Sequence, residues 1–309
     1  MRWHRWRTIR AWLVLASLLA LPGCGPGEGS SPDMVWGVRG SKPGWLLKPR
    51  AAAYDRDDHL YLVDLTDRVQ VFDREGKYLR GWRMPEFNVD GPSGVSVDRW
   101  NRLLVADTHF YRVLVFSPEG KILLQIGDGV QGSTPGRFTY PCDVVTDRAG
   151  NFYVADYGEN DRVQVFSPEG KWLRQWGGHG FEPGQFLRPR ALAIDDEDRI
   201  YVADSGTHRI QVFDSQGKLL RSWGTRGSGP GELAYPFDVA VGPDRSLYVC
   251  EYGNHRVQKF GLDGTPMGTW GDSGRGPGQL FNPWALAVDS HGAVSVIDSN
   301  NHRVQRFRM

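Results

Sequence analysis

A sequence pattern that recurs six times constrains the fold of this chain more than any other feature. Each copy opens with a proline, continues with an apolar segment that ends in an acid, and then places an arginine at the start of a second segment. The six prolines are Pro49, Pro92, Pro141, Pro189, Pro236 and Pro283. The acid–arginine pairs are Asp64 with Arg68, Asp107 with Arg112, Asp156 with Arg162, Asp204 with Arg209, Glu251 with Arg256 and Asp298 with Arg303. Repeats of this length indicate a solenoid, a propeller or an array.

Each copy predicts four short β-strands. Segments such as RVQVF, which starts at Arg162, alternate apolar and polar residues between turns rich in Gly, Asp and Pro, and this is a strand and hairpin pattern. No copy contains a helical period long enough for a helical solenoid. Four-stranded sheets repeated about an axis form a β-propeller. The sequence therefore predicts an all-β, six-bladed β-propeller.

The two ends of the repeat region complement each other. The sixth copy stops at Met309 after its third strand, whereas an unassigned strand begins at Met34. Trp36 precedes Pro49 by 13 residues, the same interval that separates Trp176 from Pro189. We therefore predict that the N-terminal strand completes the last blade, which removes an exposed sheet edge.

The repeats resemble a known family. The segments VADSGTHRIQVF, VCEYGNHRVQKF and VIDSNNHRVQRF are similar to NHL repeats, and the resemblance covers residues 34–309. It implies a propeller of NHL repeats, a fold that supports many functions. In the lyase domain of peptidylglycine-amidating enzymes, which is such a propeller, metal-binding histidines directly follow the repeat prolines. Here those positions hold Arg50, Ser93, Cys142, Arg190, Phe237 and Trp284. We therefore expect no metal, no cofactor and no catalytic residues of that kind.

The N-terminal segment predicts a destination for the protein. Residues 1–23 contain four arginines, no acid and an apolar run that is too short to span a bilayer, which indicates a secretory signal peptide. The segment Leu21-Pro22-Gly23-Cys24 resembles a bacterial lipobox, and the resemblance implies a lipid on Cys24. We expect an extracytoplasmic protein, lipid-anchored to a bacterial membrane, with a flexible tether over residues 24–33 and the propeller over 34–309.

Charge and cysteine content exclude some classes of partner and bond. From Cys24 onward the chain has 33 basic and 36 acidic residues, and this mildly acidic balance disfavours nucleic acid as a partner. Cys142 and Cys250 fall in repeats that are not neighbours. We therefore expect two separate buried thiols instead of a disulfide.

The six residues that follow the repeat prolines are the best candidates for a ligand site. They begin the innermost strands, and the family geometry points them into the mouth of the central channel. Arg50 and Arg190 belong to opposed blades, with Phe237 and Trp284 between them. Guanidinium groups beside aromatic faces favour a carboxylate or phosphate with an apolar part. Alternatively, both arginines pair with backbone carbonyls or with carboxylates in the channel.

The residue after each of these six is expected to face the opposite side of the strand. These positions hold Ala51, Gly94, Asp143, Ala191, Asp238 and Ala285. Two carboxylates could perform acid–base chemistry or bind calcium. However, the pattern Pro-x-Asp-Val that contains them is usual in NHL repeats.

Three other groups of residues are interpreted as follows. The acid–arginine pairs are structural, and an exposed pair of this kind contributes only about 0–1 kcal/mol. The histidines His208, His255 and His302 lie around a ring on connecting loops, so we expect surface histidines and not a zinc site. The loop aromatics form a partner-binding surface or cover the ends of the blades. They are His109, Phe110, Tyr111, Tyr157 and Tyr252.

We interpret the protein as a monomeric, non-catalytic binding or scaffold module. Its partner is expected to be another envelope protein or a small anionic ligand. The alternative is a metal-dependent enzyme of the lyase or lactone-hydrolase type that uses the central channel. The fold supports this alternative, and the absence of histidines after the prolines weighs against it.

Overall fold

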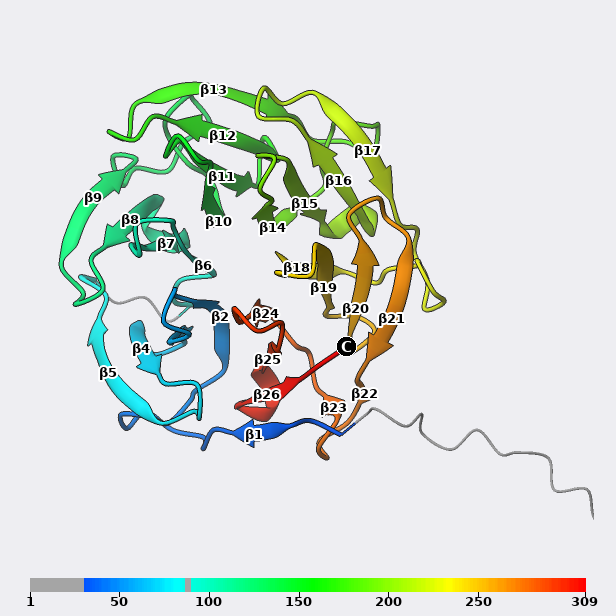
Figure 1. Ribbon diagram of the computed structural model, residues 1–309. Coiled ribbons are helices and arrows are strands. Elements are labelled where there is room, and N and C mark those ends of the chain that lie inside the picture. The colour runs from blue at the N-terminus through cyan, green and yellow to red at the C-terminus, as the bar shows by residue number, and fades with distance from the viewer. Residues whose placement is uncertain (1–30, 87–89) are drawn as a thin grey trace, which may run out of the picture. The chain divides into compact units, whose positions relative to one another are not determined.

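A computed structural model describes residues 31–86 and 90–309. Six four-stranded antiparallel sheets stand as blades around a common axis, as Figure 1 shows. The predicted signal peptide and Cys24 lie outside the described residues. Asp33, in the predicted tether, already belongs to the propeller edge, because its backbone N–H donates to the carbonyl of Arg306 (2.7 Å).

The four strands of each blade follow one another from the axis outward. Blade 1 consists of β2 (Pro49–Tyr54), β3 (Leu60–Asp64), β4 (Arg68–Phe72) and β5 (Tyr78–Arg83). Blade 2 consists of β6 (Gly94–Val97), β7 (Leu103–Asp107), β8 (Arg112–Phe116) and β9 (Ile122–Ile126). Blade 3 consists of β10 (Tyr140–Thr146), β11 (Phe152–Tyr157), β12 (Arg162–Phe166) and β13 (Trp172–Gly177). Blade 4 consists of β14 (Pro189–Ile194), β15 (Ile200–Asp204), β16 (Arg209–Phe213) and β17 (Leu219–Trp223). Blade 5 consists of β18 (Pro236–Val241), β19 (Ser246–Glu251), β20 (Arg256–Gly261) and β21 (Pro266–Trp270).

Blade 6 confirms the predicted closure of the ring. It contains β24 (Ala285–Val288), β25 (Val294–Asp298) and β26 (Arg303–Phe307), and its outermost strand is β1 (Met34–Trp36). The two chain ends pair antiparallel, with Val35 opposite Gln305. In Figure 1, β1 (blue) therefore lies beside β26 (red).

The remaining short elements lie in the connections. β22 (Asp272–Ser273) pairs in parallel with β23 (Gln279–Leu280) in the loop that leads to blade 6. The described helical elements are three short 3-10 turns, η1 (Thr108–Phe110), η2 (Ser205–Thr207) and η3 (Ser299–Asn301). No helix in the described part of the chain is long and apolar enough to cross a membrane.

The hydrophobic core lies between blades. Six apolar clusters are present among the described residues, and each combines side chains of two adjacent blades. One example is the cluster in which Val63 and Val69 of blade 1 pack with Val105 and Phe116 of blade 2. Because every blade buries both faces against its neighbours, the middle strands are apolar on both sides. Cys142 and Cys250 are buried and unbonded to each other, as expected.

Tryptophans on the outer strands extend these contacts around the rim. Trp82 of β5 packs on Phe116 of blade 2, with ring centroids 5.9 Å apart. Gly120 in the turn after β8 has a φ of +90°, and a Cβ atom there would lie 2.5 Å from Trp82. Glycine at this turn therefore lets the tryptophan of one blade cover the hairpin of the next. The same arrangement recurs with Trp36 over Gly76, Trp176 over Gly217 and Trp223 over Gly264.

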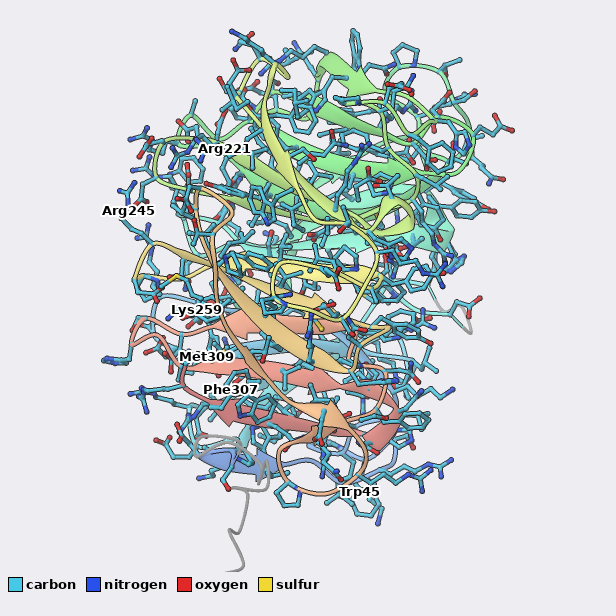
Figure 2. The ribbon with its side chains drawn as sticks, turned by 90° about the vertical axis from the view of Figure 1, so that its right-hand side faces the viewer. Trp45, Arg221, Arg245, Lys259, Phe307 and Met309 are labelled. Atoms are coloured by element: carbon cyan, nitrogen blue, oxygen red, sulfur yellow. The ribbon has the colours of Figure 1, made fainter. Side chains whose placement is uncertain are left out.

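The ring has two faces, which Figure 2 shows from the side. Trp45 lies toward one face, in the loop that leads into the innermost strand β2, and Arg245 lies at the other, in the turn that follows β18. We call the face where the innermost strands begin the mouth face. The other is the far face.

Candidate functional site

The six residues that follow the repeat prolines all border one small cavity on the axis. The cavity measures about 20 Å³, which is room for roughly one water molecule. It lies where the innermost strands begin, so it opens toward the mouth face. Its lining consists of Arg50, Ala51, Ser93, Gly94, Val95, Cys142, Asp143, Arg190, Ala191, Phe237, Asp238, Trp284 and Ala285.

The second residue after each repeat proline borders this cavity as well, which corrects the expectation that it faces the opposite side of the strand. The strand ladder is interrupted by a β-bulge at this point in four blades, between Pro49 and Ala51, Pro141 and Asp143, Pro189 and Ala191, and Pro236 and Asp238. A bulge inserts one extra residue and disturbs the alternation of sides. The mouth is lined by two residues of each blade, with Val95 as a third residue from blade 2.

Arg190 is the most unusual residue in the cavity. Its side chain is buried, with 8% of the residue exposed, and its Nε has no hydrogen-bond partner. The Arg190 side chain forms no hydrogen bond and no ion pair with any described residue. Its guanidinium carbon instead lies 4.8 Å from the ring centroid of Phe237, 5.4 Å from Trp284 and 5.8 Å from Tyr157. Because buried arginines are normally paired, this one has donors available for a ligand.

Two stacked aromatic pairs flank the Arg190 guanidinium. Tyr157 stacks on Tyr140 with centroids 5.2 Å apart, and Phe237 stacks on Tyr252 with centroids 4.4 Å apart. The cation–π contacts between Arg190 and the rings around it each contribute about 0.5–2 kcal/mol. They hold the charge without using its N–H donors. Two residues predicted as part of a loop surface, Tyr157 and Tyr252, are thus components of the channel mouth.

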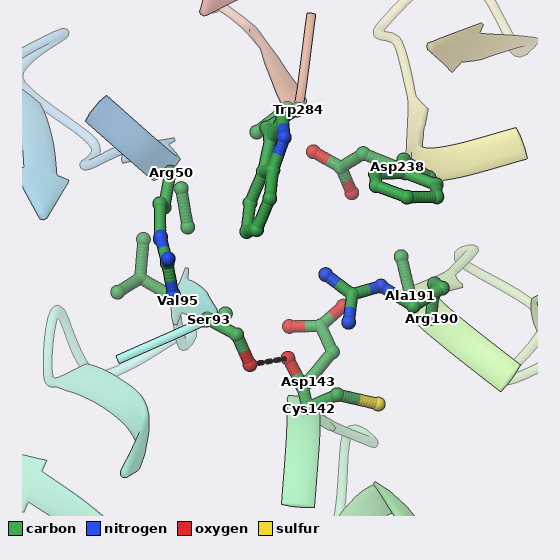
Figure 3. A pocket seen from close by; sticks show the side chains of 13 residues that line it. Arg50, Ser93, Val95, Cys142, Asp143, Arg190, Ala191, Asp238 and Trp284 are labelled. Atoms are coloured by element: carbon green, nitrogen blue, oxygen red, sulfur yellow. Dashed lines mark hydrogen bonds between the residues drawn. The ribbon is translucent and has the colours of Figure 1, made fainter. Parts of the chain in front are cut away.

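Arg50 approaches from the opposed blade. Its guanidinium carbon lies 4.5 Å from the centroid of Trp284, whose side chain points between Arg50 and Arg190 (Figure 3). Nη2 is 3.8 Å from a carboxylate oxygen of Asp90, and Nη1 donates to the Asp90 carbonyl. Burial lowers the pKa of Arg50, Asp90 raises it and the charge of Arg190 lowers it. Arg50 therefore has a carboxylate within ion-pair distance, whereas Arg190 has none among the described residues.

Ser93 and Cys142 are already bonded to the scaffold. The Ser93 hydroxyl donates to the carbonyl of Cys142 (3.1 Å, dashed in Figure 3) and lies 2.6 Å from the hydroxyl of Thr108. The Cys142 thiol donates to the carbonyl of Pro189 (2.9 Å), and burial raises its pKa. Both side chains join neighbouring blades, so they form the wall of the cavity.

Asp143 and Asp238 connect blades through backbone donors. Asp143 accepts hydrogen bonds from the N–H groups of Val144 (2.9 Å) and Leu192 (2.8 Å). Asp238 accepts equivalent bonds from Val239 and Leu286, each 2.8 Å long. Burial raises the pKa of Asp143 to about 7, and burial together with the charge of Asp143 raises that of Asp238.

These carboxylates do not suit a divalent cation in the channel. Each has its oxygens directed at backbone N–H groups, and the positive charge of Arg190 acts on both. None of the lining residues is a histidine. Elsewhere among the described residues, Asp55, Asp57 and His59 bring ligand atoms within 4.8 Å of one another. That group lies in the turn after β2, where Asp55 already binds the His59 ring (3.1 Å).

The other predicted loop aromatics lie beside the mouth, over blade 2. His109 and Tyr111 each have their rings 6.3 Å from Tyr140. Phe110 lies apart from them, beneath the guanidinium of Arg112 at 5.2 Å. The five predicted loop residues therefore do not form one surface. Four adjoin the channel aromatics, and Phe110 covers the Arg112 ion pair.

The six acid–arginine pairs all form, but they are buried, which corrects the expectation of exposed pairs. Arg162 is 2% exposed on its side chain and lies 3.0 Å from Asp156. It also donates to the carbonyls of Ser133 (2.7 Å) and Arg137 (2.8 Å), in the loop that enters the blade. Burial raises the pKa of Asp156 to about 6, against the opposing effect of Arg162. The other pairs have closest N–O distances of 2.5–3.0 Å.

The three equivalent histidines hold neighbouring blades together. Each adopts a left-handed backbone conformation, with φ between 54° and 58°. The Nδ1 atoms of His208, His255 and His302 accept hydrogen bonds from the backbone N–H groups of Tyr235, Asn282 and Lys48, respectively. Burial lowers the pKa of all three. They are therefore interblade contacts and not the free surface histidines that the sequence predicted.

Three residues of the mouth were not identified from the sequence. Tyr140 completes one aromatic stack, Arg188 lies 5.4 Å from the ring of Tyr157, and Asp90 partners Arg50. A signal for Arg188 is present in the sequence. A basic residue precedes the proline wherever an arginine follows it, in Lys48-Pro49-Arg50 and Arg188-Pro189-Arg190.

A larger hollow of about 420 Å³ lies on the far face, where the innermost strands of blades 1 to 4 end. The side chains of Arg99 and Arg148 in this hollow already bond to residues of neighbouring turns. Arg99 donates to the carbonyl of Arg148 (2.9 Å), and Arg148 pairs with Asp198 (3.2 Å). This hollow therefore lacks the unpartnered buried group found at the mouth.

Comparison with known proteins supports the repeat type and the fold. A family described as a six-bladed beta-propeller matches residues 196–270, and the NHL repeat family matches residues 282–307. Peptidyl-glycine alpha-amidating monooxygenase B of Xenopus laevis is 37% identical over 192 residues, which cover 53% of this chain and 22% of that protein. NHL repeat-containing protein 3 of Mus musculus is 29% identical over 160 residues, covering 47% of this chain and 45% of that protein. The chain thus spans about a fifth of the amidating enzyme and less than half of the second relative.

Solved structures are similar over most of the chain. A gluconolactonase from Xanthomonas campestris superposes with a TM-score of 0.64 at 17% identity, covering 84% of this chain and 85% of that one. Virginiamycin B lyase from Staphylococcus aureus superposes with a TM-score of 0.62 at 10% identity, covering 89% and 98%. At such identities the likeness concerns the fold alone. The chain is therefore a six-bladed β-propeller that contains NHL repeats.

Proposed function

We propose that this protein is a non-catalytic binding module that captures a small carboxylate at the mouth of its central channel. The observation that carries the proposal is Arg190, a buried guanidinium without a hydrogen bond or ion pair in the described part of the chain. An unpaired buried charge is costly. Its retention is accounted for if an anion completes its hydrogen bonds.

The surroundings of Arg190 favour a planar anion. The rings of Tyr157, Phe237 and Trp284 lie near the guanidinium carbon without accepting a hydrogen bond from its N–H groups. A carboxylate in the guanidinium plane can form two parallel hydrogen bonds with such a group. The cavity of about 20 Å³ has room for roughly one water molecule, so we expect only the carboxylate end of a ligand to enter it.

Acetate is the simplest probe for this site. We expect the protein to bind acetate, measured by calorimetry or by NMR shifts, and Arg190→Gln to weaken binding by about tenfold or more, because hydrogen bonds to charged groups contribute about 1.5–3 kcal/mol. Arg148→Gln removes the same charge on the far face and should leave binding unchanged. No binding of acetate by the unaltered protein, or equal binding by Arg190→Gln, would refute the proposal.

An enzyme that uses the same cavity is the second candidate. It is favoured by Asp143, a carboxyl at the cavity whose raised pKa suits proton transfer, and by the similarity to folds of a lyase and a lactonase. The bonds from Asp143 to Val144 and Leu192 weigh against it. Recovery of bound carboxylates unchanged after prolonged incubation supports the binding module, whereas conversion supports the enzyme.

We also propose that the module is attached to a bacterial membrane on its extracytoplasmic side. The support is the signal-like segment at residues 1–23 and the lipobox-like Cys24. Cys24→Ser should move the protein from the membrane fraction to the soluble fraction. Persistent incorporation of labelled lipid in that variant would contradict the assignment.

A further inference from the structure

The mouth carries two basic pairs on opposed blades. In blade 1, Lys48 precedes Pro49 and Arg50, and in blade 4, Arg188 precedes Pro189 and Arg190. Lys48 and Arg188 are exposed and adopt positive φ values of 46° and 59°. Each blade therefore presents one basic residue in the cavity and a second one outside it.

The two pairs are neutralised unequally. Arg50 has the carboxylate of Asp90 at 3.8 Å. On the opposed blade, neither Arg188 nor Arg190 forms an ion pair or a hydrogen bond with any described residue, whereas all six repeat arginines are paired. The two mouth arginines that lack an ion-pair partner among the described residues are thus both on blade 4, although the charge of Arg190 also acts on the buried carboxyls of Asp143 and Asp238.

Arg188 and Arg190 share one aromatic neighbour. Their guanidinium carbons lie 5.4 Å and 5.8 Å, respectively, from the centroid of the Tyr157 ring. The separation of the two carbons is at most the sum of these distances, so a short molecule can reach both. Tyr157 is itself held by its stack with Tyr140 (5.2 Å), which fixes its position between the cavity and the solvent.

We propose that the ligand is a small dicarboxylate, with one carboxylate on Arg190 in the cavity and the other on exposed Arg188. This inference rests on the proposed function, because Arg190 binds the first carboxylate in both. The cavity is too small for the whole molecule, and outside it Arg188, which shares Tyr157 with Arg190, is a cation without an ion pair among the described residues. The bond to Arg190 supplies most of the affinity, since desolvated charge-assisted hydrogen bonds are the strong ones. The bond to Arg188 makes the protein prefer a diacid over a monocarboxylate.

The experiment compares acetate with succinate, glutarate and adipate, whose carboxylates are progressively farther apart. We expect at least one diacid to bind more tightly than acetate by about threefold to tenfold, which corresponds to about 0.6–1.4 kcal/mol. Arg188→Gln should bring that diacid to the affinity of acetate and leave acetate binding unchanged. Arg190→Gln should weaken both.

Two matched variants separate this inference from a general effect of charge. Lys48→Gln removes the equivalent cation of the opposed blade, and Arg148→Gln removes one on the far face. Both should keep the preference for the diacid. Equal binding of acetate and all three diacids would overturn the inference while the proposed function stands. A preference abolished by Lys48→Gln but kept by Arg188→Gln, or tighter binding of inorganic phosphate than of the diacids, would overturn it as well.

Discussion

Arg162 and Arg190 are both buried arginines on neighbouring blades, and their surroundings are opposite. Arg162 is enclosed by the carboxylate of Asp156 and the carbonyls of Ser133 and Arg137. Arg190 has aromatic rings around it and no acceptor among the described residues. The first arrangement is complete within the chain, whereas the second leaves the N–H donors of the guanidinium without a hydrogen-bond acceptor among the described residues. The difference separates a scaffold site, which recurs in every blade, from the proposed binding site, which occurs once.

The largest expected effect tests the scaffold half of this comparison. Arg162→Met leaves the buried Asp156 carboxylate without its cation, and the free energy of unfolding should fall by about 3–5 kcal/mol. Urea denaturation followed by circular dichroism measures this loss. A loss below about 1 kcal/mol would mean that the pair behaves like an exposed one, and the contrast with Arg190 would then disappear.

Much of this architecture could be predicted from the sequence because it depends on local and periodic signals. Alternation within RVQVF predicts the strands, and the lone strand that ends at Trp36 predicts the closure, which the pairing of Val35 with Gln305 confirms. Blade geometry then orders the innermost strands around one axis. That order depends only on the repeat, so the six residues that directly follow the prolines could be anticipated as part of the cavity lining.

The properties that distinguish one arginine from the other could not be predicted. Burial of the Arg162 pair depends on a loop carbonyl, that of Arg137, brought in from a different part of the repeat. The bulge before Asp143 is a feature of backbone pairing with no residue signature of its own. Likewise, the stack of Tyr140 on Tyr157 joins two segments that the sequence analysis assigned to different roles. Such contacts depend on three-dimensional proximity, which a repeat pattern does not specify.

A second prediction uses pH to test the scaffold. Burial lowers the pKa of His208 from 6.5, and its neutral Nδ1 accepts the N–H of Tyr235. Because the folded state disfavours the protonated ring, its contribution to stability is present above pH 6.5 and is lost as the pH falls through the folded pKa. The loss is at most about 1.4 kcal/mol per pH unit. In His208→Asn, where Oδ1 can replace Nδ1, urea denaturation from pH 7.5 to 5.5 should show a correspondingly smaller loss, and an identical pH profile would contradict this role.

The affinity of the channel mouth for an anion should fall as the pH rises, whereas the stability contributed by His208 falls as the pH decreases. Burial raises the pKa of Asp143 to about 7, so this carboxyl is neutral below that value and negative above it. A bound anion is therefore repelled as the pH rises through about 7, and the affinity for acetate should fall by up to roughly tenfold between pH 6 and pH 8. Calorimetric titrations at several pH values measure this change. An affinity that stays constant or rises over this range would show that Asp143 does not act on the bound anion.

The smallest expected effect completes the comparison. Arg190→Met removes a buried charge whose side chain makes no hydrogen bond or ion pair within the described chain, so the variant loses only the longer-range effect of this charge on the carboxyls of Asp143 and Asp238, whose pKa values burial already raises. The lost cation–π contacts with Phe237, Trp284 and Tyr157 are offset by the removal of a desolvated guanidinium. We expect the free energy of unfolding, measured without added anion, to change by less than about 1 kcal/mol in either direction. Acetate should raise the stability of the unaltered protein and not that of the variant, because a ligand stabilises only the folded state that binds it. If Arg190→Met lowered the free energy of unfolding as much as Arg162→Met does, Arg190 would be part of the scaffold, and this result would contradict a binding site at the channel mouth.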